Sequence, residues 1–97
     1  MTRSEIEAVL SNVSVGDVLQ VHYSHSGQPD RVFTGRVSSV FALEDGPVDD
    51  VHFETGQHVY FNEDAKVNFG EKRVEQLNVG WRFNDTTNIV TSVETAV

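Results

Sequence analysis

The chain has 97 residues, with 15 acidic side chains against 7 basic ones and no cysteine. This length suits one domain with a single hydrophobic core. The lack of thiols excludes a disulfide framework, a thiolate metal site and a cysteine nucleophile. Neither a membrane-spanning apolar run nor the apolar segment of a signal peptide is present in the sequence, so we expect a cytoplasmic protein without a membrane partner.

The N-terminal residues predict a short amphipathic helix over about residues 3–11. Thr2 and Ser4 are each followed, three positions later, by a glutamate, which is the spacing of a capping box. Apolar residues then recur at helical spacing, at Ile6, Val9, Leu10 and Val13.

Beyond Gly16 the apolar period changes to two, which predicts a first strand. Leu19, Val21 and Tyr23 share one face of this strand because side chains alternate between the faces of a sheet. A polar loop over residues 24–30 is expected to follow.

The second predicted strand, over about residues 32–41, is long and has an awkward phase. Val37 and Val40 fall on opposite faces of a regular strand. A bulge near Gly35 or at the Ser38-Ser39 pair would turn both valines inward. We therefore expect a strongly bent strand.

Residues 51–54 and 58–61 predict a hairpin whose two faces differ in chemistry. A three-residue loop, Thr55-Gly56-Gln57, would pair Glu54 with His58 and Phe53 with Val59. This register gathers Val51, Phe53, Val59 and Phe61 on the core face and His52, Glu54, His58 and Tyr60 on the outer face.

The last third predicts one helical or 3-10 turn near residues 71–77 and a hairpin of residues 80–83 and 88–93 around residues 84–87. The C-terminal tail is expected to fray. Together these elements predict a mainly β fold: a single domain over 1–97 with a short N-terminal helix and a small, strongly bent barrel of about five to seven antiparallel strands over about residues 15–93.

Two motifs carry a family resemblance. Gly16-Asp17-Val18 and Gly35-Arg36-Val37-Ser38-Ser39-Val40 resemble the Gly-Asp-x-Val and Gly-x-Val-x-x-Val patterns of SH3-like barrels, which include translation-factor, Sm-like and PRC-type barrels. The resemblance covers about residues 15–61 and implies the SH3-like barrel fold. The second motif of Sm-like proteins is absent, so ring-forming RNA binding is not implied. Such a fold leaves the activity open.

The formal net charge of −8 restricts the partners. Only two of the seven basic residues are lysines, and this composition resembles that of cytoplasmic proteins from salt-adapted archaea. At ordinary salt the charge repels phosphate backbones. At molar salt the Debye length is about 3 Å, so an RNA partner is compatible with the charge there.

The outer face of the predicted hairpin is the first candidate site. His52, Glu54 and His58 could present two imidazoles and a carboxylate to zinc or another divalent ion. The alternative is a solvated face on which Glu54 and His58 form a cross-strand polar pair.

An acidic turn precedes this hairpin and comprises Glu44, Asp45, Asp49 and Asp50. It lacks the spacing of a calcium loop and is expected to attract only solvated cations.

The second candidate site is a basic-aromatic group. Its members are Lys66, Phe69, Lys72, Arg73, Trp81 and Arg82, joined by Arg36 if the second strand folds against them. Aromatic rings among cations suit single-stranded nucleic acid, which needs stacking and phosphate neutralisation. In the alternative interpretation, Phe69 and Trp81 belong to the core and the cations balance an acidic surface.

No pattern in the chain assembles a catalytic site. A Gly-x-Ser-x-Gly elbow, a His-Glu-x-x-His helix and a phosphate loop are all absent from the sequence. We therefore expect a non-catalytic binding or interaction module without a cofactor and with an unknown protein partner. RNA binding through the basic-aromatic group and a metal site on the histidine face are the alternatives. A buried Trp81 would favour the protein partner, and an exposed one beside clustered cations would favour nucleic acid.

Overall fold

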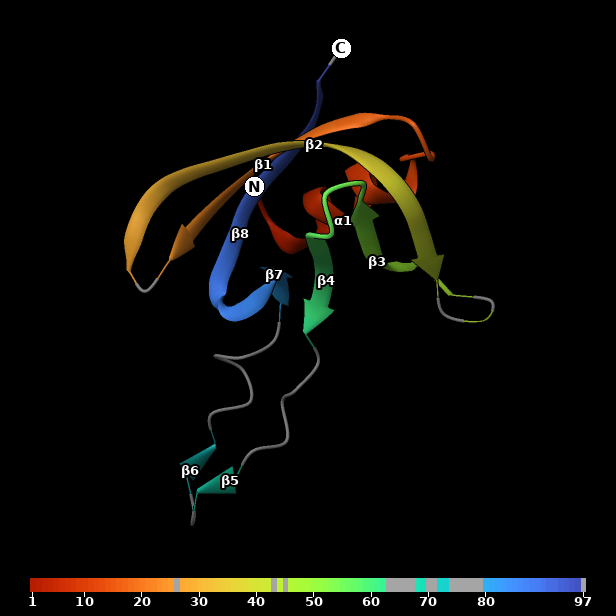
Figure 1. The fold of residues 1–97 in the computed structure, drawn as a ribbon. Helices are drawn as coiled ribbons and strands as arrows, with labels where there is room; N and C mark the ends of the chain where they lie inside the picture. Colours follow the sequence, from red (N-terminus) through yellow and green to blue (C-terminus); the bar gives the residue numbers. More distant parts are fainter. Residues whose placement is uncertain are drawn as a thin grey trace.

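The computed structural model describes residues 1–25, 27–42, 44, 46–62, 68–69, 72–73 and 80–96. Within these residues, six strands pair in the order β1-β2-β3-β4-β7-β8, and β8 returns to β1 to close an antiparallel barrel (Figure 1). β5 and β6 form a separate two-stranded sheet. The elements are α1 (Arg3–Ser11), β1 (Val18–His25), β2 (Gln28–Ala42), β3 (Val48–Phe53), β4 (His58–Asn62), β5 (Asn68–Phe69), β6 (Lys72–Arg73), β7 (Gly80–Phe83) and β8 (Asp85–Ala96). The predicted mainly β barrel with a short N-terminal helix is confirmed.

Helix α1 begins with the predicted capping box. The Glu5 N–H donates to the Thr2 hydroxyl at 3.2 Å, and the Thr2 N–H donates to the Glu5 carboxylate at 2.8 Å. The helix lies against β3 and β8 and buries Ile6 and Leu10 in the core. In the part of the chain that the structure describes, no helix is long and apolar enough to cross a bilayer.

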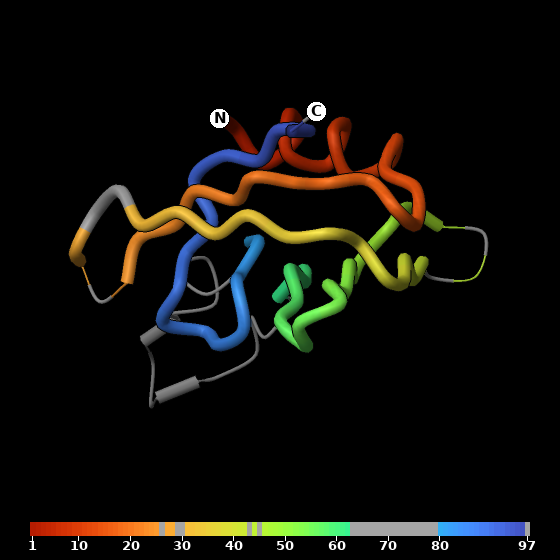
Figure 2. Tube along the Cα trace, turned by 45° about the horizontal axis from the view of Figure 1, so that its top comes forward, coloured from red at the N-terminus to blue at the C-terminus, as the bar shows by residue number. Residues whose placement is uncertain are grey.

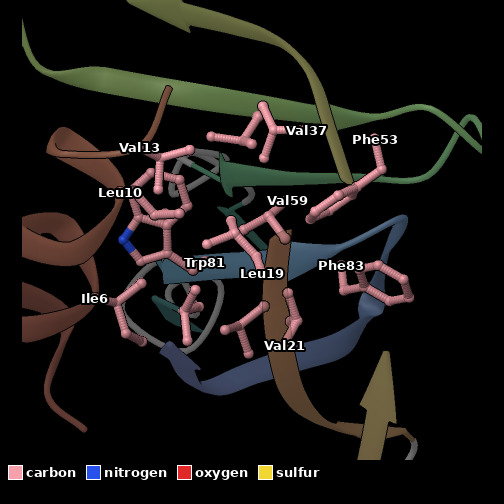
Figure 3. Packing of buried hydrophobic residues seen from close by; sticks show 13 residues of the cluster. Ile6, Leu10, Val13, Leu19, Val21, Val37, Phe53, Val59, Trp81 and Phe83 are labelled. Atoms are coloured by element: carbon pink, nitrogen blue, oxygen red, sulfur yellow. The ribbon is translucent and has the colours of Figure 1, made fainter. Parts of the chain in front are cut away.

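The barrel interior is packed with aliphatic and aromatic side chains from α1 and from all six barrel strands (Figure 3). Leu19 and Val21 of β1 and Val59 of β4 are fully buried at its centre. Phe33 contacts both Phe53 and Phe83, with ring centroids 4.9 Å apart in each pair. This packing orients the opposite faces of the strands toward the surface.

Strand β2 bends as the sequence predicts, and the bulge is at Ser38. Pairing with β3 shifts between Val37, opposite Phe53, and Ser39, opposite His52. The extra residue turns both valines toward the core, so that Val37 is buried and Val40 packs against the core cluster. β2 runs along the length of the molecule from its hairpin with β1 to its pairing with β3 (Figure 2).

Gly35 has a different role from the predicted bulge. A Cβ atom at this position would lie 2.6 Å from the ring of Phe33 and 3.2 Å from that of Phe53. Glycine therefore lets these two rings pack over the strand.

The β1–β2 hairpin is longer than its sequence suggests. The predicted polar loop over residues 24–30 is wrong at its edges, because β1 continues to His25 and β2 begins at Gln28. Pairing between His25 and Gln28 follows a register shift, and Gly27 has a φ of +84°. Both strands therefore extend into the segment that the sequence assigned to the loop.

The β3–β4 hairpin has the predicted faces in a different register. His52 lies opposite His58 and Val51 opposite Val59, two positions from the predicted pairing. The Phe53 N–H donates to the Gln57 carbonyl at 2.8 Å and the Gly56 N–H to the Phe53 carbonyl at 3.0 Å, so the three loop residues are Glu54, Thr55 and Gly56. Gly56 has a φ of +96°, and the third position of such a loop requires this left-handed conformation.

The C-terminal third departs from its prediction at three points. β8 begins at Asp85 directly after Asn84, whose φ is 65°, so the loop is shorter than residues 84–87. It continues to Ala96 opposite Val18, where a frayed tail was expected, because β1 supplies its hydrogen bonds. Lys72–Arg73 is a strand, and the remaining residues of the turn predicted over 71–77 lie outside the described residues.

Candidate metal centre

Three potential metal ligands converge on the outer face of the barrel at β3 and β4. One donor atom from each of Asp50, His52 and His58 lies within 4.8 Å of the other two. All three residues are half-buried, with 28, 39 and 29% of their side chains exposed respectively. No other such group of histidine, cysteine and acidic side chains occurs within the described residues.

The strand geometry places these side chains together. Asp50 and His52 are two residues apart on β3, so they point to the same face, and His58 of β4 lies directly opposite His52. Asn84 fixes His58 from the other side: its side-chain oxygen accepts the His58 N–H at 3.0 Å, and its own N–H donates to the His58 carbonyl at 2.9 Å. The sequence pattern predicts only a loop position for Asn84.

Asp50 bridges the two imidazoles. One carboxylate oxygen lies 3.0 Å from Nδ1 of His58, and the other lies 3.2 Å from Nε2 of His52. Each ring is therefore positioned to donate an N–H to this carboxylate. Two donors of a tetrahedral zinc ion, each bound at about 2.1 Å, lie about 3.4 Å apart, so a pair separated by 4.8 Å must close by about 1.4 Å when an ion binds.

Aromatic rings flank both histidines. The Phe41 ring of β2 packs edge-on against His52 with centroids 5.0 Å apart, and the Tyr60 ring stacks on His58 at 4.8 Å. His52 and His58 are themselves 4.9 Å apart, so the four rings form a continuous row across three strands. We call Phe41, His52, His58 and Tyr60 the ring row.

The Tyr60 phenol is neutral at ordinary pH. Burial raises its pKa above the usual 10.0, Arg82 opposes this shift, and Asp85 and Asp50 add to it. Its contribution at neutral pH is thus an aromatic face with a hydroxyl group.

The carboxylate of this site differs from the predicted one. Glu54, which was expected beside the histidines, lies in the loop, where its N–H donates to the Arg36 carbonyl at 2.9 Å and its carboxylate is 3.9 Å from the Arg36 guanidinium. Asp50 takes its place because β3 begins at Val48, three residues before the predicted strand. The spacing Asp50-x-His52 is the sequence signal that would have identified it, since alternate residues share a face.

The acidic turn is divided by the same strand geometry. Asp49 and Asp50 point to opposite faces of β3, and Asp49 lines a hollow of about 200 Å³ that also touches Arg3 and Trp81. Glu44 is exposed, and Asp45 lies outside the described residues. The described carboxylates of the turn therefore do not form one group of potential ligands.

Two members of the basic-aromatic group are buried. Trp81 is 3% exposed and packs edge-on against Phe61 with centroids 5.4 Å apart. Arg82 is 4% exposed, donates from Nε to the Thr86 carbonyl at 3.1 Å, and has its pKa lowered by burial. Neither side chain offers an open surface for base stacking or phosphate contact.

The other described members of that group lie on β2 and on the β5–β6 sheet, where Phe69 pairs with Lys72. Arg36 is on β2, where it donates to the Gly16 carbonyl at 3.1 Å and faces Glu54. Phe69 ends β5, and Lys72 and Arg73 form β6. Lys66 lies outside the described residues. RNA binding by this group stays a prediction.

Two imidazoles and one carboxylate on a single face form a donor set that suits zinc, iron, nickel or copper better than calcium or magnesium. A second surface hollow, of about 470 Å³, lies at the ends of β1 and β8 and is lined by Gly16, Asp17, Val18, Thr95 and Ala96. The Asp17 carboxylate in this hollow accepts the Ser14 N–H at 2.9 Å.

Comparison of the chain with protein-family models, with curated proteins and with solved structures finds no match.

Proposed function

We propose that this protein is a non-catalytic binding module whose ligand is a divalent transition-metal ion, with zinc as the reference ion. The observation that carries the proposal is the convergence of Asp50, His52 and His58, whose donor atoms lie within 4.8 Å of one another. Two residues at i and i+2 on one strand and one on its neighbour bring three ligands to the same side of an ion.

The interactions among the three side chains are compatible with this role. Binding replaces two Asp50–imidazole hydrogen bonds, each worth about 0.5 to 1.5 kcal/mol net, or more when the acceptor is ionised. Three metal–ligand bonds are formed in return, and half-burial of the ligands lowers the competition from water. The Asn84 contacts hold the His58 backbone in place, which reduces the entropy lost when its ring is fixed.

Titration with zinc and cobalt(II), followed by calorimetry and by the ring resonances of the histidines, tests the proposal. We expect one ion per chain and coupled changes at His52 and His58. Zinc binding should weaken by about 10-fold to 100-fold or more in each of three variants, His52→Ala, His58→Ala and Asp50→Asn. Loss of a residue that only hydrogen-bonds to a metal ligand already weakens metal affinity by this factor.

Two variants serve as matched controls. Glu54→Gln removes the carboxylate that the sequence predicted and the structure places in the loop, and His22→Ala removes a histidine of β1 that lies near Gln20 and Glu94 instead. Both should leave zinc affinity unchanged. Binding that survives Asp50→Asn but fails in Glu54→Gln, or that no histidine variant alters, would refute the site.

Two broader proposals accompany this one. The bent β2, with its bulge at Ser38, supports placing the barrel in the SH3-like class. The net charge of −8, with only two lysines, supports adaptation to high salt, where screening relieves repulsion between surface carboxylates.

A further inference from the structure

We propose that the metal ion at Asp50, His52 and His58 keeps an open coordination position that takes a carboxylate with an apolar body. This inference rests on the proposed metal binding and adds the ligand class of the same site. It follows from three features of the site: its open side, its charge and the rings beside it.

The site is open on its outer side. All three ligands come from β3 and β4, so they approach an ion from the sheet, and between 28 and 39% of each side chain is exposed. Within the described residues, no fourth histidine, cysteine or acidic side chain joins the group. Zinc with three protein ligands takes its fourth from solvent or a bound molecule.

The charge of the loaded site selects an anion. One divalent cation with the Asp50 carboxylate and two neutral imidazoles has a local charge of +1. The chain as a whole carries −8, which repels polyanions such as nucleic acids at ordinary salt. A monoanion fits both conditions, and a carboxylate is a monoanion whose oxygen zinc accepts as a ligand.

The ring row supplies an apolar wall. Phe41 is 50% exposed, although its ring edge packs on His52 with centroids 5.0 Å apart. At the other end Tyr60 stacks on His58 at an angle of 17°. A ligand whose carboxylate reaches the ion can lay its apolar body against Phe41, which removes exposed aromatic surface from water.

Such a carboxylate has two sources: a free aromatic acid, or the C-terminal carboxylate of a peptide that ends in an apolar residue. The cobalt(II)-loaded full chain distinguishes them, because its visible absorption changes when a coordinated ligand is exchanged. The probes are benzoate, acetate, inorganic phosphate and a short peptide ending in phenylalanine, beside the same peptide with an amidated C-terminus.

We expect benzoate to bind at least about 10-fold tighter than acetate, which corresponds to about 1.4 kcal/mol. Phe41→Ala should abolish this preference when the benzoate and acetate affinities are measured on the cobalt-saturated variant. Val32→Ala, which truncates another exposed apolar residue of β2 (49% exposed), should leave the preference unchanged. If the peptide with a free C-terminal carboxylate binds and its amidated form does not, a chain terminus is a source of the carboxylate ligand.

The outcomes separate the two proposals. If cobalt binds with the expected dependence on Asp50, His52 and His58, yet benzoate leaves the spectrum unchanged or binds no better than acetate, the carboxylate proposal is wrong and the metal site stands. If phosphate binds tighter than benzoate, the ring row does not select the ligand. If cobalt does not bind, both proposals fail.

Discussion

Truncation of Phe53 tests which face of the β3–β4 hairpin is buried, and the candidate site depends on that face. In the structure Phe53 is 2% exposed and packs edge-on against Phe33 with centroids 4.9 Å apart. Phe53→Ala therefore removes a full core side chain, which costs about 3 to 5 kcal/mol through lost burial and the cavity left behind. A domain of this size has about 5 to 15 kcal/mol of stability in total, so the variant should lose between about a fifth and all of it.

Phe41→Ala is the matched control because it deletes the same atoms at an exposed position. Phe41 is 50% exposed, so roughly half the transfer free energy of a phenylalanine is at stake and little cavity forms, which gives about 1 kcal/mol. His58→Ala should also cost about 1 kcal/mol, since it loses the 3.0 Å contact with Asp50 and its stacking on Tyr60.

Urea unfolding, followed by the fluorescence of Trp81 and by circular dichroism, measures all three variants. Trp81 is the only tryptophan and is buried, so its emission reports the core. Each kcal/mol of lost stability lowers the thermal midpoint of such a domain by about 4 to 8 °C, so the midpoint of Phe53→Ala should fall by roughly 12 to 40 °C. A severe His58→Ala with a mild Phe53→Ala would mean that the strand faces are reversed, and equal costs for Phe41→Ala and Phe53→Ala would refute the assigned burial.

Two further predictions concern charge. The backbone N–H of Thr2 lowers the pKa of Glu5 from its usual 4.5, so the stability from this carboxylate is present above pH 4.5 and is lost as pH falls through the lowered value. Glu5→Gln should thus be less stable than the wild type at neutral pH, and the difference in stability should shrink in acid. Urea unfolding at neutral and at acid pH measures this difference, and a difference that does not change with pH would contradict the prediction. If the acidic excess is a salt adaptation, the thermal midpoint should rise between about 0.1 M and about 2 M KCl by more than that of a charge-balanced domain of equal size, and a flat or falling midpoint would remove that proposal.

Local patterns in the sequence were sufficient for several elements. The capping box at Thr2 and Glu5 and the apolar spacing after it define α1, because both signals act within a few residues along the chain. The mismatch between Val37 and Val40 likewise indicates the bulge at Ser38, since both valines must reach the core. The two faces of the β3–β4 hairpin were also predictable, because alternation depends only on whether a position is odd or even.

Tertiary structure decided the composition of the candidate site. The loop lies one residue earlier than predicted, so that Gly56 takes the left-handed position. This change shifts the strand pairing by two residues and keeps both faces. It also places Glu54 beside Arg36 and His58 opposite His52. Asp50 joins the site because β3 starts at Val48, where pairing with β2 supplies its hydrogen bonds. Long-range packing also buries Trp81 and Arg82, whose residue types alone fit a surface equally well. Alternation is a local property of the chain, whereas register and burial depend on which strands become neighbours.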